Sequence, residues 1–176
     1  MAGIAKFRIE AAIPADWTRI SSLQEACFPN DPTEVSKGEF GALLAEQGGR
    51  VIVARSGLRP VGYVVMRRRE FTPWESLAFV AVERDCRSMG VGKLLTIAAT
   101  ELSPKLFTRL HVRPSNETAL AVYRRLGFHV TGRKINNYPD GEDALVMMRW
   151  NGLPMWRIMA PVAHNPAIML ANPVER

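Results

Sequence analysis

The stretch DCRSMGVGKLL, residues 85–95, joins a segment with strand-like alternation to a segment with helical periodicity. It contains Gly90 and Gly92, with Arg87 before them and Lys93 after them. Glycines at such a junction let the backbone approach an anion closely, and the free amides and dipole of the helix that follows attract negative charge. The stretch therefore predicts a phosphate-binding turn, although a tight turn that only begins a helix has the same spacing.

Two nucleotide-binding patterns fail on the residues themselves. A P-loop needs Ser or Thr after its Gly-Lys pair, and here Lys93 is followed by Leu94. A dinucleotide fingerprint needs a third glycine where this chain has Leu95. The pyrophosphate of coenzyme A is the remaining candidate.

Composition limits the class of protein. The chain has 176 residues, of which 47% are apolar and 23% charged, so one globular domain is expected. Neither a signal peptide nor an apolar run long enough for a bilayer is present, which predicts a cytoplasmic protein that binds no membrane. Cys27 and Cys86 lack metal-ligand spacing, so we expect two buried thiols in a reducing compartment and no metal site.

The charge pattern argues against nucleic acid as a partner. The formal net charge is +6, but the arginines are spread along the chain apart from the run at residues 67–69. A solvated strand end explains that run better than a nucleic-acid patch does. A nucleic-acid binder is therefore the least favoured alternative.

Apolar periodicity predicts an α/β domain with a mixed sheet, in the order β-α-α-β-β-β-α-β-α-β-β. The expected strands are residues 6–13, 50–56, 60–69, 75–82, 106–112, 129–138 and 143–150, and the expected helices are 14–26, 34–46, 90–102 and 116–126. We expect one domain over residues 1–150. The extension 151–176, rich in Pro, Met and Ala, is expected to pack on the domain or on a partner subunit, which leaves a homodimer open.

Two further stretches identify a family. LHVRPSNETALAVYRRLGF, residues 110–128, places Asn116 at a helix start and Tyr123 seven residues later, and INNYPDGEDALVM follows at residues 135–147. Together with R-x-x-G-x-G, they resemble the GNAT acetyltransferase superfamily. The second stretch narrows the resemblance to bacterial ribosomal-protein alanine acetyltransferases and to catalytic subunits of eukaryotic N-terminal acetyltransferases. The resemblance covers residues 9–150 and implies splayed central strands in a mostly antiparallel sheet flanked by helices, with acetyl-CoA as cosubstrate.

The resemblance also assigns the cofactor contacts. Backbone amides of the turn would hold the pyrophosphate, and they belong to Arg87, Ser88, Met89, Gly90, Val91, Gly92 and Lys93. The backbone of Val80 and Val82 would pair with the pantetheine arm like an added strand. Asn116 would touch the cofactor, while its place at a helix start equally predicts an N-cap.

By the same resemblance, Tyr123 is the general acid. Acetyl transfer expels a thiolate, which a nearby phenol can protonate. The alternative is an ordinary aromatic side chain that packs beside Leu120 and Phe128.

His111 is the candidate base. An α-ammonium group has a pKa near ~8 and an imidazole one near ~6.5, so an imidazole can take the proton directly or through water. Bacterial relatives have glutamate here, whereas some eukaryotic ones have LHV as in this chain. Strand alternation places His111 with Arg109 and Arg113, opposite Leu110 and Val112, which argues against a core histidine. The tyrosine that holds water in the His-bearing relatives is replaced by Ser76.

The acceptor side is matched less closely. Phe28 and Pro29 would form the wall for the first acceptor side chain, and Tyr138 would close over its backbone. A structural role explains these residues almost as well: Phe28 and Pro29 would only fix a loop, and Tyr138 would only pack in a hairpin. Thr33 and Asn137 depart from the family pattern.

The expected activity is acetyl transfer from acetyl-CoA to the α-amine of a protein or peptide, by direct attack in a ternary complex. One alternative keeps the chemistry and changes the acceptor to a lysine side chain or a small amine. The other is a CoA-binding interaction module without turnover.

Overall fold

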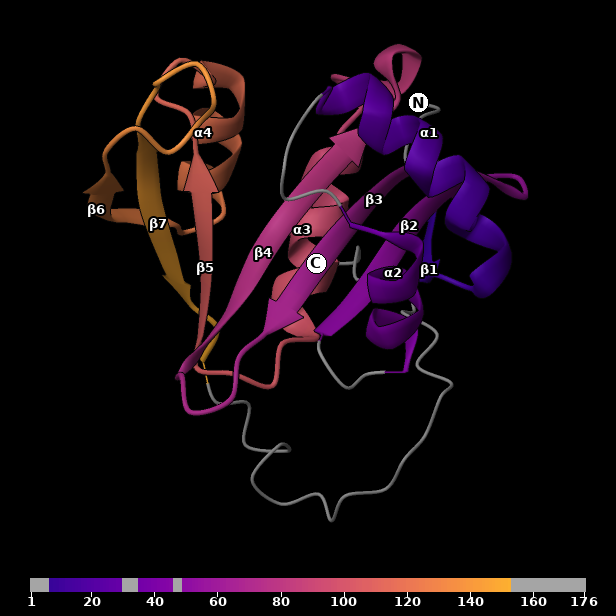
Figure 1. Cartoon of the computed structure of the whole chain (residues 1–176), viewed down its shortest axis with the longest axis horizontal. Coiled ribbons are helices and arrows are strands. Elements are labelled where there is room, and N and C mark those ends of the chain that lie inside the picture. Colours follow the sequence, from indigo (N-terminus) through magenta and orange to yellow (C-terminus); the bar gives the residue numbers. More distant parts are fainter. Residues whose placement is uncertain (1–6, 30–34, 46–48, 153–176) are drawn as a thin grey trace, which may run out of the picture.

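A computed structural model describes residues 7–29, 35–45 and 49–152. They form one seven-stranded mixed sheet in the order β1-β2-β3-β4-β5-β7-β6 (Figure 1). The strands are β1 (Arg8–Ala11), β2 (Gly49–Ser56), β3 (Arg59–Arg68), β4 (Trp74–Val82), β5 (Phe107–Val112), β6 (His129–Lys134) and β7 (Ala144–Trp150). The helices are α1 (Trp17–Cys27), α2 (Lys37–Leu44), α3 (Val91–Glu101) and α4 (Glu117–Arg125), with short 3-10 turns η1 (Pro14–Asp16) and η2 (Arg84–Cys86). This confirms the predicted α/β class and element order, whereas the extension beyond residue 152 lies outside the described residues.

The largest departures from the predicted boundaries are in the second helix and the sixth strand, and β1 also ends at Ala11, two residues earlier than predicted. The second helix was expected over residues 34–46, but α2 begins at Lys37 because Ser36 caps it, its hydroxyl accepting a hydrogen bond from the Glu39 amide at 3.1 Å. The sixth strand was expected to reach residue 138, but β6 ends at Lys134. Asn136 has a φ of 49°, so the chain turns there instead of continuing extended.

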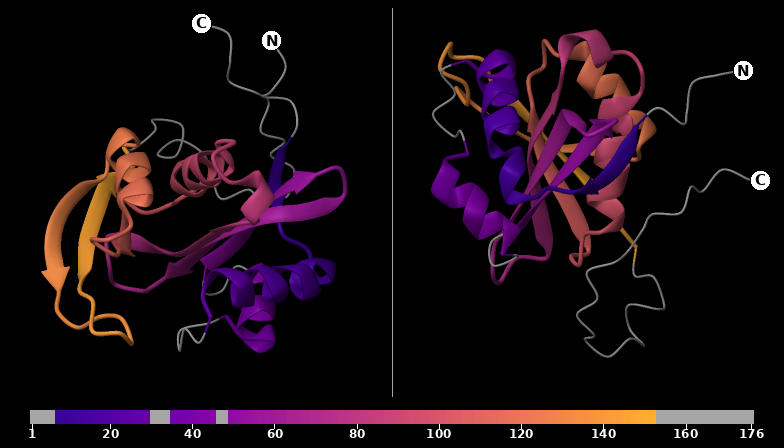
Figure 2. Two further views of the ribbon diagram at one scale, coloured as in Figure 1. Left: turned by 90° about the horizontal axis from the view of Figure 1, so that it is seen from above. Right: turned by 90° about the vertical axis from the view of Figure 1, so that its right-hand side faces the viewer.

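The sheet buries a separate apolar cluster on each face. Helices α1 and α2 cover one face, and α3 and α4 cover the other (Figure 2, left). Helix α3 approaches closely because Gly62 lies beneath it. A Cβ at that position would lie 2.8 Å from the Ala81 carbonyl oxygen and 3.2 Å from Leu95 Cδ1.

The two central strands separate after a short parallel ladder. Residues Trp74–Leu77 of β4 pair with Phe107–Leu110 of β5, and the pairing stops there. The β3–β4 register shifts at the same point, which leaves Ala78 as an extra residue in β4. A bulge bends and twists its strand, so β4 turns away from β5, as Figure 1 shows. The predicted splay is therefore present, and the opening that it creates is called the β4–β5 fork below.

One expectation is wrong: neither thiol is fully buried. Cys27 and Cys86 are both free and partly exposed. Cys27 is the last residue of α1, and Cys86 lies in the surface turn η2. Among the described helices, none is long and apolar enough to cross a membrane.

Candidate active site

The turn after β4 has the geometry of an anion-binding site. Ser88 and Gly90 have positive φ values of 60° and 81°, and residues 87–90 are exposed. The Leu94 amide donates to the Gly90 carbonyl at 3.0 Å, the first bond of α3. The amides of Val91, Gly92 and Lys93 precede it and therefore have no partner within the helix. A left-handed turn that leads into a helix N-terminus suits a phosphate.

The two basic residues of this turn differ in placement. Lys93 is exposed on the first turn of α3. The Arg87 side chain turns back toward the end of β4, where its Nε donates to the Val82 carbonyl oxygen at 3.2 Å. Its second guanidinium nitrogen lies 3.6 Å from Cys27 Sγ. Arg87 thus connects the turn to β4 and to the end of α1.

Val80 and Val82 lie along the fork, beyond the last β4–β5 pair. Their side chains pack partly buried against the α3 face, as expected for core residues. A Cβ at Gly92 would lie 3.7 Å from Val82 Cγ2 and 3.9 Å from Val80 Cγ1, so the start of α3 sits directly on this part of β4. The turn before α3 and the part of β4 that has no β5 partner are therefore adjacent, as the predicted contacts with the diphosphate and the pantetheine arm require.

Asn116 caps helix α4. Its Oδ1 accepts a hydrogen bond from the Ala119 amide at 3.1 Å, and the side chain is exposed. The N-cap interpretation is confirmed, and the cofactor contact stays a prediction.

His111 lies on β5 just past the point where β4 leaves it. Along β5, Thr108, Leu110 and Val112 are buried and His111 is exposed, so its side chain lies off the core stripe as predicted. Partial desolvation lowers the pKa of His111, and the positive charges of Arg109 and Lys134 lower it further. The imidazole is therefore held in its neutral, proton-accepting form at neutral pH.

Tyr123 lies on α4, on the opposite face of the sheet. Its ring packs edge-on against Phe128, with 5.7 Å between centroids, and contacts the core cluster beneath α3 and α4. Burial raises the pKa of Tyr123 to about 12, with a further contribution from Tyr138. Tyr123 is thus both a packing aromatic and a phenol that stays protonated.

The predicted acceptor residues lie on the face of the sheet that α1 and α2 cover. This face, next to the β4–β5 fork, is called the acceptor side below. Phe28 packs against Phe79 of β4, with 5.3 Å between ring centroids, and Pro29 is exposed. Tyr138 lies in the β6–β7 connection, which curls to the same side of the sheet as α1 and α2 (Figure 2, left). Residues 30–34, including Thr33, lie outside the described residues.

Sequence reasoning missed how Tyr138 is held. The Arg113 guanidinium lies over the Tyr138 ring, with Cζ 3.8 Å from the centroid. The same guanidinium bonds Asp140 and Glu142, each at 2.7 Å. Glu142 also accepts from the amide and hydroxyl of Ser115, at 2.9 and 3.0 Å. We call this set, Arg113 with Ser115, Tyr138, Asp140 and Glu142, the Arg113 clamp. Alternation placed Arg113 beside His111, but nothing in the sequence paired it with the hairpin.

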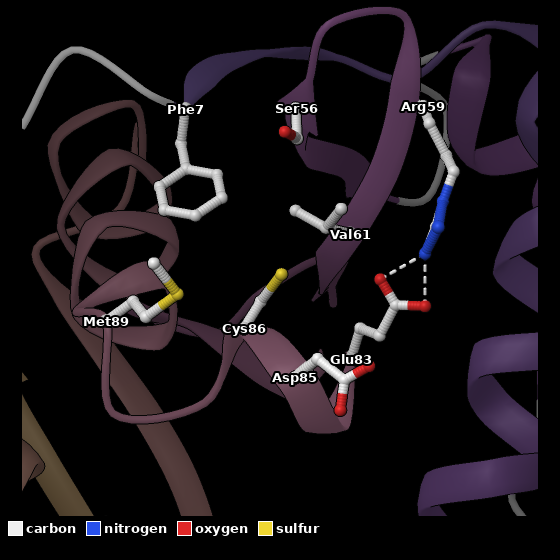
Figure 3. A pocket seen from close by; sticks show the side chains of 8 residues that line it. All are labelled: Phe7, Ser56, Arg59, Val61, Glu83, Asp85, Cys86 and Met89. Carbon is white, nitrogen blue, oxygen red and sulfur yellow. Dashed lines mark hydrogen bonds and ion pairs between the residues drawn. The ribbon is translucent and has the colours of Figure 1, made fainter. Parts of the chain in front are cut away.

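A pocket of about 330 Å³ lies elsewhere. Figure 3 shows Phe7, Val61, Cys86 and Met89 around it, with the Arg59–Glu83 ion pair at its edge. Neither His111 nor Tyr123 lines it, so it is distinct from the fork. Within the described ranges, no three His, Cys, Asp or Glu side chains gather where they could hold a metal ion.

The family follows from a direct comparison. Residues 17–128 match the model of the Acetyltransferase (GNAT) family. The chain therefore belongs to that family of acetyl-CoA-dependent N-acetyltransferases, as the resemblance implied.

Several curated relatives match across different lengths. The chain is 31% identical to the N-alpha-acetyltransferase RimI of Mycobacterium tuberculosis, over 83% of this chain and 94% of that protein. It is 37% identical to the N-terminal acetyltransferase A complex catalytic subunit ard1 of Schizosaccharomyces pombe, over 51% of this chain and 55% of that protein. It is 32% identical to the peptidyl-lysine N-acetyltransferase YjaB of Escherichia coli, over 43% of this chain and 46% of that protein. The chain thus spans about half the length of the last two, and 38% of protein ML0378 of Mycobacterium leprae.

Solved structures share the fold. Ard1 from Thermoplasma volcanium gives a TM-score of 0.70 at 24% identity, covering 83% of this chain and 98% of that one. The ribosomal-protein-S18-alanine N-acetyltransferase from Escherichia coli gives a TM-score of 0.71 at 21% identity, covering 84% of this chain and 96% of that one. The yncA structure from Salmonella typhimurium, with its cofactor acetyl-CoA, gives a TM-score of 0.71 at 17% identity, covering 85% of this chain and 96% of that one.

Proposed function

We propose that this protein transfers the acetyl group of acetyl-CoA to the N-terminal α-amine of a protein or peptide. The observation that carries the proposal is the arrangement of two groups about the β4–β5 fork. A neutral imidazole, His111, lies on the acceptor side, and a protonated phenol, Tyr123, lies on the side of α3 and α4. Their protonation states are those that a base and an acid need at neutral pH.

In this mechanism His111 accepts the proton that the α-ammonium must lose, directly or through water. The free amine then attacks the thioester carbonyl carbon, the carbon–sulfur bond breaks, and the nitrogen releases its second proton to water as the amide forms. Tyr123 donates its proton to the departing thiolate, so the products are the acetylated amine and free CoA. The turn at residues 87–93 and the free edge of β4 would hold the diphosphate and the pantetheine arm.

The charges on the acceptor side support an α-amine over a polycationic small molecule. Glu39 is bonded to Arg67, which lies over the Phe79 ring that Phe28 contacts, and Asp140 and Glu142 are bonded to Arg113, which lies over Tyr138. These carboxylates are therefore not exposed as unpaired anions for a polyamine or an aminoglycoside. The similarity to RimI, an N-alpha-acetyltransferase, and to ard1, an N-terminal acetyltransferase catalytic subunit, also favours an α-amine, whereas the similarity to YjaB, a peptidyl-lysine N-acetyltransferase, keeps lysine as the second candidate.

The deciding experiment is acetyl transfer to peptides that contain one lysine and carry either a free or a blocked N-terminus. We expect mass spectrometry to locate the acetyl group on free α-amines only. Acetyl-lysine in the blocked peptides would instead identify a lysine acetyltransferase.

A second measurement separates an enzyme from a binding module. Tyr123→Phe keeps the ring that packs on Phe128 and removes the proton donor, so kcat should fall about 100-fold. Calorimetry should show acetyl-CoA binding close to that of the wild type. Tight acetyl-CoA binding without turnover in the wild-type protein would contradict the proposed activity.

A further inference from the structure

The acceptor side of the fork carries a local excess of positive charge. Arg109 and His111 alternate on the same face of β5. Val146 of β7 pairs with both His111 and Gly132 of β6, and Lys134 follows two residues after Gly132. Since alternate residues share a face, Lys134 lies on the same side of the sheet as Arg109 and His111.

These two cations have no carboxylate partner in the part of the chain that the structure describes. Arg109 is partly exposed and lies over the Trp74 ring, with Cζ 5.0 Å from the centroid. Lys134 is exposed. Neither makes an ion pair within the described residues, whereas neighbouring Arg133 is bonded to Asp143 at 2.6 Å.

The carboxylates linked to the predicted acceptor residues are themselves paired with other arginines. Glu39 is bonded to Arg67 at 2.7 Å, and Asp140 and Glu142 are bonded to Arg113. The positive charges of Arg109 and Lys134 also lower the pKa of His111, in addition to its partial desolvation, which agrees with an excess of positive charge around the imidazole. An unpaired positive patch beside a reactive centre attracts anionic ligands and repels cationic ones.

We propose that the acceptor is a peptide with acidic residues directly after its N-terminus, whose carboxylates bind Arg109 and Lys134. This inference rests on the proposed function, because it concerns the residues that follow the reacting α-amine. It deepens that function by making Arg109 and Lys134 specificity-determining residues. It also predicts that acceptors with lysine at the same positions are disfavoured.

The test compares three peptides that begin Ala-Glu-Glu, Ala-Gln-Gln and Ala-Lys-Lys and are otherwise identical. Exposed ion pairs are weak, so we expect kcat/KM to be about fivefold higher for the Glu peptide than for the Gln peptide. The Lys peptide should be the poorest acceptor. The difference between the Glu and Gln peptides should shrink as salt is raised.

Variants assign the preference to the two cations. In Arg109→Gln and in Lys134→Gln, the ratio of kcat/KM for the Glu peptide to that for the Gln peptide should fall about two- to threefold. Using a ratio within one enzyme cancels any change that the variant makes to the pKa of His111. Arg133→Gln is the matched control, since it removes the same charge one residue away, from the other face of β6, and should keep the ratio.

Each outcome bears on a defined statement. Equal rates for the Glu and Gln peptides, or a preference that survives in both variants, would overturn the acidic-acceptor inference and leave α-amine acetylation standing. Absence of α-amine acetylation in all three peptides would instead refute the proposed function. A readout independent of turnover is the affinity of CoA conjugated through an acetyl linker to the N-terminus of the Glu or Gln peptide. The Glu conjugate should bind more tightly, and equal affinities would also overturn the inference.

Discussion

His111 shows how its surroundings prepare a single side chain for its proposed role. Its position on an exposed strand face leaves the imidazole accessible. Partial desolvation and the two nearby cations lower its pKa below the ordinary ~6.5. A base with a lowered pKa is deprotonated over a wider pH range, so it remains ready at pH 7.

This shift predicts the pH dependence of the reaction. Turnover needs the neutral imidazole, so kcat should be lost as pH falls through the lowered pKa, giving an acid limb below about 6.5. The profile should be measured as kcat at saturating acceptor, so that ionisation of the free peptide does not contribute. His111→Gln should remove the limb and slow turnover about 100-fold.

Arg109→Gln provides the matching control for this limb. It removes one of the two positive charges that disfavour the imidazolium, so the limb should move to higher pH. A wild-type limb at or above pH 6.5, or one that persists in His111→Gln, would remove His111 from the mechanism.

The connection between β6 and β7, residues 135–143, is held by ion pairs, and none of its residues belongs to either apolar cluster. The Arg113 clamp joins three segments: Arg113 directly follows β5, Tyr138 lies in the β6–β7 connection, and Ser115 lies in the loop before α4. The Arg113 guanidinium holds the pKa of Glu142 below its usual range, so this carboxylate stays charged well into the acid range. The clamp therefore positions Tyr138 throughout the physiological pH range.

Removing Arg113 should loosen the acceptor side and spare the cofactor side. In Arg113→Ala, Tyr138 loses its cationic partner, and Asp140 and Glu142 are left close together with like charges. A cation–π contact contributes about 1–2 kcal/mol when partly desolvated, so the KM for the acceptor peptide should rise about tenfold. Steady-state kinetics with each substrate varied in turn should show a KM for acetyl-CoA within twofold of the wild type.

The control for this variant is Arg133→Ala, which breaks the ion pair with Asp143 on the same hairpin without touching Tyr138. It should leave both KM values nearly unchanged. If Arg113→Ala raised the KM for acetyl-CoA as much as that for the peptide, the clamp would act on the whole fold instead of on the acceptor side.

At the level of the whole molecule, the fork depends on a buried polar group where the two central strands meet. Glu75 pairs with Thr108 in the short β4–β5 ladder, and its side chain is fully buried. Its Oε2 accepts hydrogen bonds from Arg50 at 2.5 Å and from Ser103 at 2.8 Å. Glu75 thus connects β4 to β2 and to the segment after α3, below the point where the strands separate.

Glu75→Gln should destabilise the fold. Removing one member of a buried ion pair leaves its partner uncompensated, and such changes cost about 3 kcal/mol or more. Urea unfolding followed by circular dichroism should therefore show a clearly lower midpoint with an unchanged slope. Glu70→Gln, at an exposed position in the β3–β4 turn, should keep the wild-type midpoint. Equal midpoints for the two variants would show that the Glu75 ion pair does not stabilise the fork.

The fold was largely predictable because its signals are local. Apolar alternation and periodicity located all the elements in their correct order, and Asn116 and the glycines of the phosphate turn marked helix starts. The predictions that missed depended on one side chain's environment. Ser36 shortened α2 by capping it, and the turn at Asn136 ended β6 early. Cys27 and Cys86 are partly exposed because they end surface elements, which their apolar character did not reveal.

The sequence alone determined the element order, the glycine-containing turn before α3 and the face on which His111 lies, because each depends on residues close together in the chain. Only the tertiary structure decided what those residues meet. The bulge at Ala78 opens the fork, and strand register brings Lys134 to the His111 face. Likewise, the fold places Arg113 over Tyr138, 25 residues along the chain. Pairings of this kind depend on register and strand twist, which no local pattern encodes, and they determine the charge and shape of the acceptor side.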